Sequence, residues 1–208
     1  GCGMTLPVAM VHQVKAAQDL ILCPTCTRML FYPAQDLPRR IPQEMNRFGS
    51  APKIGLSRFS SEKLMLPHTK AQSKEDVFNE ICTMLQENDY IDDQAALFEA
   101  AMRREAIVST ALEHGLAFPH VRGVEGGGLT LACATSEAGF AFDAGEKNLT
   151  HIVFFVVIPT AASAFYLKLL SGLTRTFQKK AARDRVAAYN DQDKLWKGLC
   201  SLTKNTIK

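Results

Sequence analysis

Apolar residues recur along most of the chain at the spacing of amphipathic helices. Ser73, followed by Asp76, has the spacing of a helix cap and predicts that a helix begins there. A second helix is predicted from Asp93 to about Arg104, and a last one over Gln192–Leu202. The inward positions of the four predicted helices are Val77, Phe78, Ile81 and Leu85; Leu97, Phe98 and Ala101; Phe165, Leu169, Leu173 and Phe177; and Leu195, Leu199 and Leu202.

Short apolar runs between these helices predict strands. The run 116–118 precedes Pro119, which favours an extended conformation for Phe118. The runs 129–134 and 152–158 are longer. The second is apolar on both faces, which indicates a central strand. The chain after about Phe59 is therefore predicted to be an α/β domain of mixed helices and strands.

The first quarter of the chain lacks this periodicity. Residues 34–57 contain several prolines and glycines and are predicted to be a linker. Residues 1–33 carry three clustered cysteines. We therefore divide the chain into a small cysteine module at 1–33, a linker at 34–57 and a large domain at 58–208.

Cys23 and Cys26 form a Cys-x-x-Cys pair, and Cys2 lies upstream. This spacing indicates the end of a zinc site whose fourth ligand is expected before Gly1, or is replaced by water or His12. A redox dithiol is the alternative interpretation of Cys23 and Cys26. The segment 23–32 resembles the Cys-Pro-x-Cys-x-Arg-x-Leu-(Tyr/Phe)-Tyr pattern of a C4 zinc-ribbon family, so the module is expected to be an incomplete zinc ribbon.

Composition excludes several classes of function. The formal net charge is only +3, and the longest apolar run is far too short to cross a membrane. No basic and apolar leader opens the sequence, so we expect a soluble, cytoplasmic protein. Nucleic-acid binding has little support, because a few arginines at 28, 39, 40 and 47 do not form a known reader motif.

One histidine stands out for its setting. His120 follows Pro119, which restricts the approach of the chain and the direction of the imidazole. A neutral imidazole is available near physiological pH and can accept a phosphoryl group. Arg104 would stabilise the phosphoryl oxygens, and Ser109 and Thr110 would add hydroxyl donors. By itself, the same pattern also fits an ordinary surface histidine in a turn.

A longer resemblance favours the phosphoryl acceptor. The segment resembles the active-site pattern of IIA components of the bacterial sugar phosphotransferase system, in the fructose–mannitol class that includes the nitrogen-regulatory IIA proteins. That pattern is Arg-Glu, a Ser-Thr pair, and Gly-(Ile/Val)-Ala-(Ile/Val)-Pro-His. Here it appears as Arg104-Glu105, Ser109-Thr110 and Gly115-Leu116-Ala117-Phe118-Pro119-His120. Residues 139–144 also resemble the Ile-Ala-Phe-Asp-Ala turn of the family, and the similarity covers about residues 57–205.

The resemblance implies a mixed β-sheet flanked by helices, with His120 as the phosphorylated residue and Arg104 as its charge partner. The implied phosphoryl donor is a histidine phosphocarrier protein, and the implied recipient is a IIB component or a regulated protein. Where the family usually has a second histidine, this chain has Tyr166, and Val121 replaces a small residue. These departures favour a regulatory phosphotransfer protein over a sugar-transport subunit. A IIA-like module that binds or senses a partner without phosphorylation is the alternative.

Overall fold

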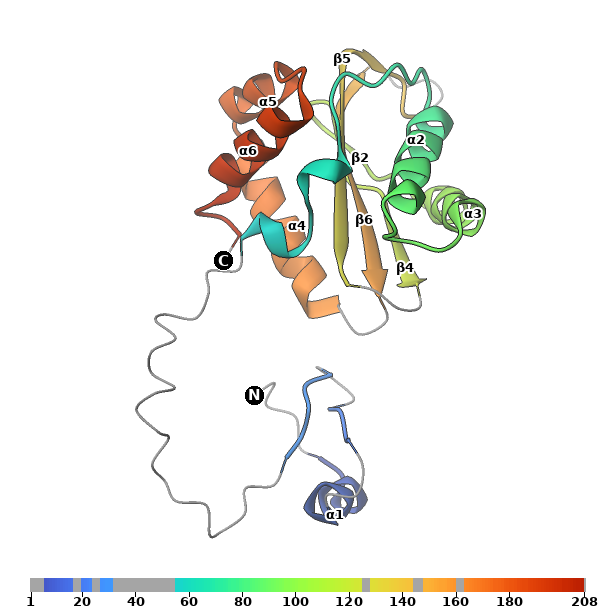
Figure 1. Ribbon diagram of the computed structural model, residues 1–208, viewed down its shortest axis with the longest axis vertical. Coiled ribbons are helices and arrows are strands. Elements are labelled where there is room, and N and C mark those ends of the chain that lie inside the picture. The colour runs from blue at the N-terminus through green and yellow to red at the C-terminus, as the bar shows by residue number, and fades with distance from the viewer. Residues whose placement is uncertain are drawn as a thin grey trace. The chain divides into compact units, whose positions relative to one another are not determined.

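The computed structural model describes residues 6–16, 20–23, 27–31, 55–124, 128–143, 148–159 and 163–207. The chain separates into two compact units, residues 1–53 and 54–208. In the first unit, helix α1 (Val8–Ala16) precedes an antiparallel bridge between Leu22 and Met29 (Figure 1). The second unit holds the predicted histidine site.

The second unit is built on a six-stranded mixed sheet. Its strand order is β1-β5-β6-β3-β2, and β4 also pairs with β6. Strand β5 runs antiparallel to β6, whereas β3 and β4 run parallel to it. The mixed sheet expected from the family resemblance is therefore present. The strands are β1 (Met65–Leu66), β2 (Ala111–Leu112), β3 (Leu116–Ala117), β4 (His120–Val124), β5 (Thr130–Phe140) and β6 (Thr150–Pro159).

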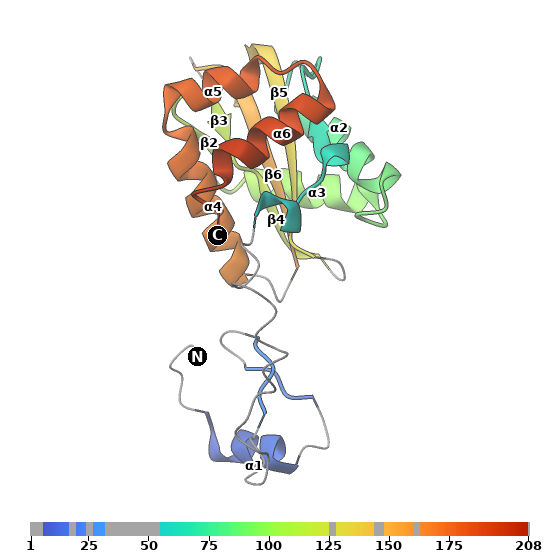
Figure 2. The same cartoon turned by 60° about the vertical axis from the view of Figure 1, so that its left-hand side comes forward.

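Helices cover both faces of this sheet. Helices α2 (Lys74–Glu87) and α3 (Gln94–Glu105) lie on one face (Figure 1). A second group of helices, towards the C-terminus, packs against the opposite face (Figure 2). That group contains α4 (Ser163–Phe177), α5 (Lys180–Ala187) and α6 (Gln192–Thr203), while two short 3-10 helices, η2 (Leu56–Arg58) and η3 (Glu62–Leu64), precede the sheet.

Side-chain caps fix the starts of three helices. Ser73 Oγ accepts a hydrogen bond from the backbone N–H of Asp76 at 3.1 Å, as the capping spacing predicted. Asp93 caps α3 and Asp191 caps α6 in the same way. Each such cap stabilises a helix by about 1 kcal/mol, because it satisfies a backbone donor that has no partner within the helix.

Strand β6 forms the centre of the core, as its apolar sequence predicted. Every side chain from residue 152 to 158 is buried on one face or the other. The Phe155 ring meets Phe78 of α2 at a centroid separation of 5.4 Å. The Phe154 ring meets Phe177 of α4 at 4.9 Å. One strand thus holds both helical layers in place.

Three features differ from the sequence expectations. His120 begins strand β4, a strand that the apolar pattern did not predict. Strand β5 continues to Phe140, beyond the predicted end at 134. Helix α5 was not predicted, because its polar sequence lacks a clear apolar stripe. Among the described residues, the helices are all too short or too polar to cross a membrane.

Candidate functional site

His120 is the first residue of strand β4 and directly follows Pro119. It is the register partner of Val156 on β6, whose backbone N–H donates to the Pro119 carbonyl at 2.9 Å. This hydrogen bond therefore attaches the residue before His120 to the buried central strand β6. His120 is half-buried.

The backbone determines which ring nitrogen is available. Nδ1 of His120 lies 3.3 Å from the carbonyl oxygen of Phe118. A carbonyl oxygen only accepts hydrogen bonds, so in the neutral ring Nδ1 carries the proton. The lone pair is then on Nε2, which is the nucleophilic position.

Two arginines act on this imidazole. Arg104 belongs to the last turn of α3, and Arg122 lies two residues after His120 on β4. Burial lowers the pKa of His120 below the usual 6.5, and the charges of Arg104 and Arg122 lower it further. The hydrogen bond to Phe118 opposes them. The ring therefore stays neutral over a wider pH range than an exposed histidine.

Tyr166 packs beside the histidine. Its ring centroid lies 5.3 Å from that of His120, with the planes tilted by 38°. Only 4% of the Tyr166 surface is exposed. Burial raises the pKa of the Tyr166 hydroxyl, although Arg122 and Arg104 oppose this shift. Tyr166 is therefore a neutral aromatic neighbour of His120 at physiological pH.

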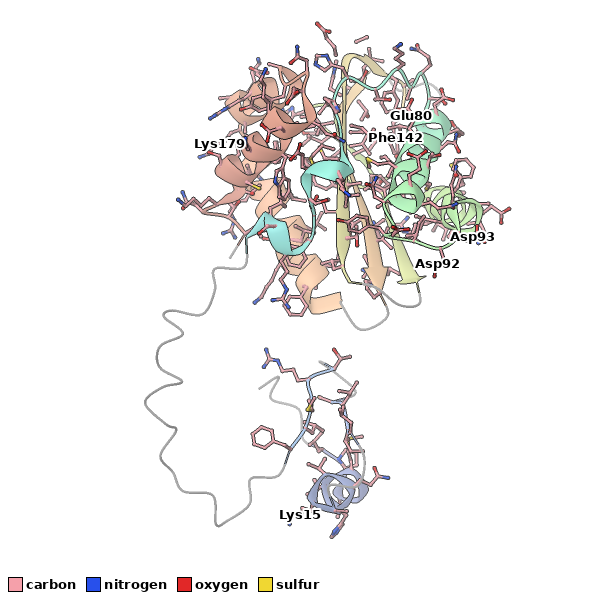
Figure 3. The ribbon with its side chains drawn as sticks, viewed as in Figure 1. Lys15, Glu80, Asp92, Asp93, Phe142 and Lys179 are labelled. Carbon is pink, nitrogen blue, oxygen red and sulfur yellow. The ribbon has the colours of Figure 1, made fainter. Side chains whose placement is uncertain are left out.

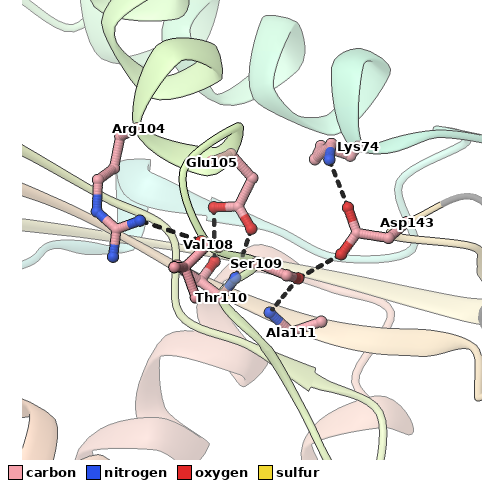
Figure 4. Close-up of polar contacts among 8 residues, drawn as sticks. All are labelled: Lys74, Arg104, Glu105, Val108, Ser109, Thr110, Ala111 and Asp143. Carbon is pink, nitrogen blue, oxygen red and sulfur yellow. Dashed lines mark hydrogen bonds and ion pairs between the residues drawn. The ribbon is translucent and has the colours of Figure 1, made fainter.

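Ser109 and Thr110 lie in the loop after α3, and each donates hydrogen bonds to a carboxylate. Thr110 donates two hydrogen bonds to the buried Glu105 carboxylate, from its backbone N–H at 2.5 Å and its hydroxyl at 2.9 Å (Figure 4). Ser109 donates its hydroxyl to Asp143. The expected hydroxyl donors are thus engaged in holding the loop.

The same loop places Arg104. One guanidinium nitrogen of Arg104 donates to the Val108 carbonyl at 3.1 Å (Figure 4). Asp143, which accepts from Ser109, also accepts from Lys74 at 2.6 Å. Burial would raise the pKa of Asp143, but the hydrogen bonds from Lys74 and Ser109 and the Lys74 charge lower it overall. An ionised Asp143 therefore links the start of α2 to the loop that anchors Arg104.

The structure brings His120, Arg104 and Tyr166 into one neighbourhood. Sequence reasoning missed Arg122, which also acts on the imidazole. The available signal was strand alternation, because residues two apart on a strand point to the same face. It was overlooked because no strand was predicted after Pro119.

A pocket of about 440 Å³ lies between β4 and the loop that joins α2 to α3. Val121 and Val157 line it from the sheet, and Asp92 and Asp93 line it from the loop. Figure 3 labels Asp92 and Asp93 beside α3. Arg122 also lines this pocket. The pocket and the histidine site therefore share one residue.

The predicted zinc ligands are only partly within the described residues. Cys2 and Cys26 lie outside them, and Cys23 is buried with 3% of its surface exposed. Its backbone carbonyl accepts a hydrogen bond from the N–H of Thr27 at 2.8 Å. Among the described residues, three or more possible metal ligands do not come together.

Curated relatives of the chain fall into two groups. A fructose-specific EIIA component of Haloferax volcanii is 28% identical over 96 residues, 46% of this chain and 62% of that protein. A fructose-specific EIIABC component of Bacillus subtilis is 25% identical over 136 residues. The matched segment is 63% of this chain and 21% of that protein. A nitrogen regulatory protein of Bradyrhizobium diazoefficiens is 26% identical over 61% of this chain and 86% of its own length. The chain thus spans less than two thirds of the first two relatives.

Solved structures share the fold of the second unit. Nitrogen regulatory protein IIA-Ntr from Neisseria meningitidis matches with a TM-score of 0.63 at 24% identity, over 69% of this chain and 98% of its own. Enzyme IIAMTL from Escherichia coli, in a complex with phosphorylated enzyme IIBMTL, matches with a TM-score of 0.55 at 16% identity, over 68% and 96%.

The domain that carries the histidine site matches the model of a known protein family. Residues 58–201 match the model of the phosphoenolpyruvate-dependent sugar phosphotransferase system, EIIA 2. This match covers more than half of the chain and includes all of strands β1–β6 and helices α2–α5. The chain belongs to the EIIA 2 family of the phosphoenolpyruvate-dependent sugar phosphotransferase system.

Proposed function

We propose that this protein is a phosphotransfer regulator that accepts a phosphoryl group on Nε2 of His120 from a histidine phosphocarrier protein. The supporting observation is one half-buried imidazole whose Nδ1 faces the Phe118 carbonyl while Arg104 and Arg122 act on the ring. This arrangement presents a neutral nucleophile to an anionic donor.

The reaction is a displacement at phosphorus. The Nε2 lone pair forms a new N–P bond while the N–P bond of the donor phosphohistidine breaks. The donor ring is protonated on its other nitrogen, so it takes the electrons of the broken bond and leaves as a neutral imidazole. The Phe118 carbonyl stabilises the Nδ1 proton as positive charge develops on the His120 ring. Arg104 offsets the charge on the phosphoryl oxygens, where most of the stabilisation in phosphoryl transfer is needed.

The regulatory role rests on two observations. The relatives include a protein named as a nitrogen regulatory protein, which this chain matches over 86% of its length. Tyr166 lies beside His120, and a tyrosine does not serve as a cation or base near neutral pH. We propose that the cytoplasmic phosphorylated form acts mainly on a regulated protein, with a IIB component as a second possible recipient.

The test uses a phosphorylated histidine phosphocarrier protein as the donor. The wild-type protein should gain one phosphoryl group by intact mass, and His120→Ala should gain none. Arg103→Ala is a matched control, because Arg103 precedes Arg104 but pairs with Glu99 at 3.2 Å on the exposed surface. A gain that persists in His120→Ala, or no gain in the wild type, would contradict the proposal.

A second candidate function is a binding module that works without phosphorylation. The pocket of about 440 Å³ that borders Arg122 favours this alternative, because it offers space for a small ligand next to the site. A partner that binds wild type and His120→Asp equally well, together with no phosphoryl gain, would favour it over the phosphotransfer role.

A further inference from the structure

One aromatic ring contacts both the histidine and the second arginine of the site. The Tyr166 ring lies 5.3 Å from the His120 ring, measured between centroids. The central guanidinium carbon of Arg122 lies 5.3 Å from the centroid of the same Tyr166 ring. Tyr166 therefore contacts two groups from strand β4 that the sequence separates by one residue.

The backbone explains why these groups meet. His120 and Arg122 have the same parity on β4, so their side chains project to the same face. The pairing of β4 with β6 is irregular between Arg122 and Val124, and Gly123 has a φ of +77° at this point. A bulge of this kind re-aims the neighbouring side chain. Arg122 is thereby set at the end of the regular register.

The three side chains differ in how firmly the protein holds them. Tyr166 is 4% exposed and lies on α4, between core residues of the helix. Arg122 is exposed, and no ion pair fixes it among the described residues. A long exposed side chain loses much rotamer freedom when it is fixed. The buried aromatic face is therefore the feature that favours one position of the guanidinium.

We propose that Arg122 is a second phosphoryl-binding cation of this site, and that Tyr166 is the positioning residue that holds it next to His120. This inference rests on the proposed phosphoryl acceptance at His120. A guanidinium over an aromatic face keeps its N–H donors free at the edges, where they can bind phosphoryl oxygens. Arg104 and Arg122 then approach the group from different elements, α3 and β4.

A tyrosine suits this role better than a second histidine. Burial raises the pKa of Tyr166, so its ring stays neutral and attracts the guanidinium. A histidine at the same position would repel Arg122 whenever it took up a proton. The residue that departs from the family pattern is thus the one that permits a second cation.

The first measurement is an NMR titration of His120, which needs no donor protein. Arg122→Ala should raise the pKa of His120, because a nearby positive charge is lost. Tyr166→Leu should also raise it, and the effect should be smaller in the Arg122→Ala background than in the wild type. Tyr166→Phe, which retains the ring, and Arg103→Ala, which removes another exposed positive charge, should leave the pKa of His120 unchanged. Equal effects of Tyr166→Leu in both backgrounds would mean that Tyr166 acts through burial alone, and would overturn its positioning role.

The second measurement is phosphorylation by phosphoramidate, a small donor that requires no docking surface. The Nε2–P bond forms as the P–N bond of the donor breaks and ammonia leaves. Loss of one partly exposed charge-assisted contact should slow this reaction about tenfold in Arg122→Ala. Arg103→Ala should react like wild type. A wild-type rate in Arg122→Ala would overturn the role of Arg122.

The two assays separate this inference from the proposed function. Failure of the phosphocarrier protein to phosphorylate the wild type, with the phosphoramidate and titration results as expected, would refute the partner and leave the Tyr166–Arg122 pair standing. Should Tyr166→Leu fail to fold, Tyr166→Met replaces it, since methionine is a flexible side chain that fills irregular core space.

Discussion

The hydroxyl of Ser109 donates a hydrogen bond to the carboxylate of Asp143, 34 residues further along the chain. The same carboxylate accepts from Lys74 at the start of α2. Through this one side chain the loop after α3 is joined to a second helix. The loop in turn offers the Val108 carbonyl to Arg104. The position of Arg104 therefore depends on a polar link that does not contact the histidine.

Replacing Ser109 with alanine should loosen the loop without disturbing the core. Loss of one exposed hydrogen bond to a charged acceptor should cost about 1 kcal/mol in the free energy of unfolding. Phosphorylation of His120 should slow as well, because the Val108 carbonyl that binds the Arg104 guanidinium would no longer be held in one position. Urea unfolding and phosphorylation rates measure the two effects.

The control is a double-mutant cycle with Asp143→Asn. If Ser109 acts through Asp143, the two substitutions together should cost less than the sum of their separate effects. Additive costs would show that Ser109 positions the loop by another route. Lys74 remains in every variant, so the cycle isolates the Ser109–Asp143 contact.

Thr110 carries the second prediction. Its hydroxyl and its N–H both bind Glu105, a carboxylate only 4% exposed. Thr110→Val keeps the shape but removes the hydroxyl, which leaves a buried carboxylate short of one donor. We expect a loss of about 2 kcal/mol in the free energy of unfolding by urea. Thr110→Ser retains the hydroxyl and should lose much less, and equal stability of the two variants would contradict this account.

The sequence predicted the elements that local chemistry determines. Ser73 and Asp93 were identified as helix starts, and both side chains cap their helices. The apolar run of β6 predicted a central strand, since a segment that is apolar on both faces has to be covered on both. These features depend on neighbours within a few residues.

Other features depend on contacts that are distant in sequence. Strand β4 has polar and glycine residues typical of an edge, and β1 and β2 have two residues each, too few for any periodicity. The ion pair of Lys74 with Asp143 joins positions 69 apart. Family resemblance pointed to the turn that contains Asp143, but only the fold shows its partners.

The cysteine module gives a prediction about metal content. Cys2, Cys23 and Cys26 are expected to bind zinc through thiolates, with one place left for another ligand. The purified chain should contain zinc by atomic emission, and Cys23→Ser should lose most of it. Phosphorylation of His120 should be unchanged in that variant, since the histidine lies in the other compact unit. A zinc-free chain whose Cys23 and Cys26 form a disulfide on mild oxidation would favour the redox interpretation.

The lowered pKa of His120 predicts how stability and activity change with pH. Burial and two arginines keep the folded ring neutral below pH 6.5, where an unfolded histidine takes up a proton. The unfolded state then binds more protons, so the free energy of unfolding should fall as the pH decreases from about 6.5 toward the folded pKa. Phosphorylation should persist through this range, because Nε2 keeps its lone pair. Urea unfolding between about pH 5 and 7 lies above the range where Asp143 titrates, since the pKa of Asp143 is lowered. His120→Gln should flatten the slope in this window, and an unchanged slope would show that another group is responsible.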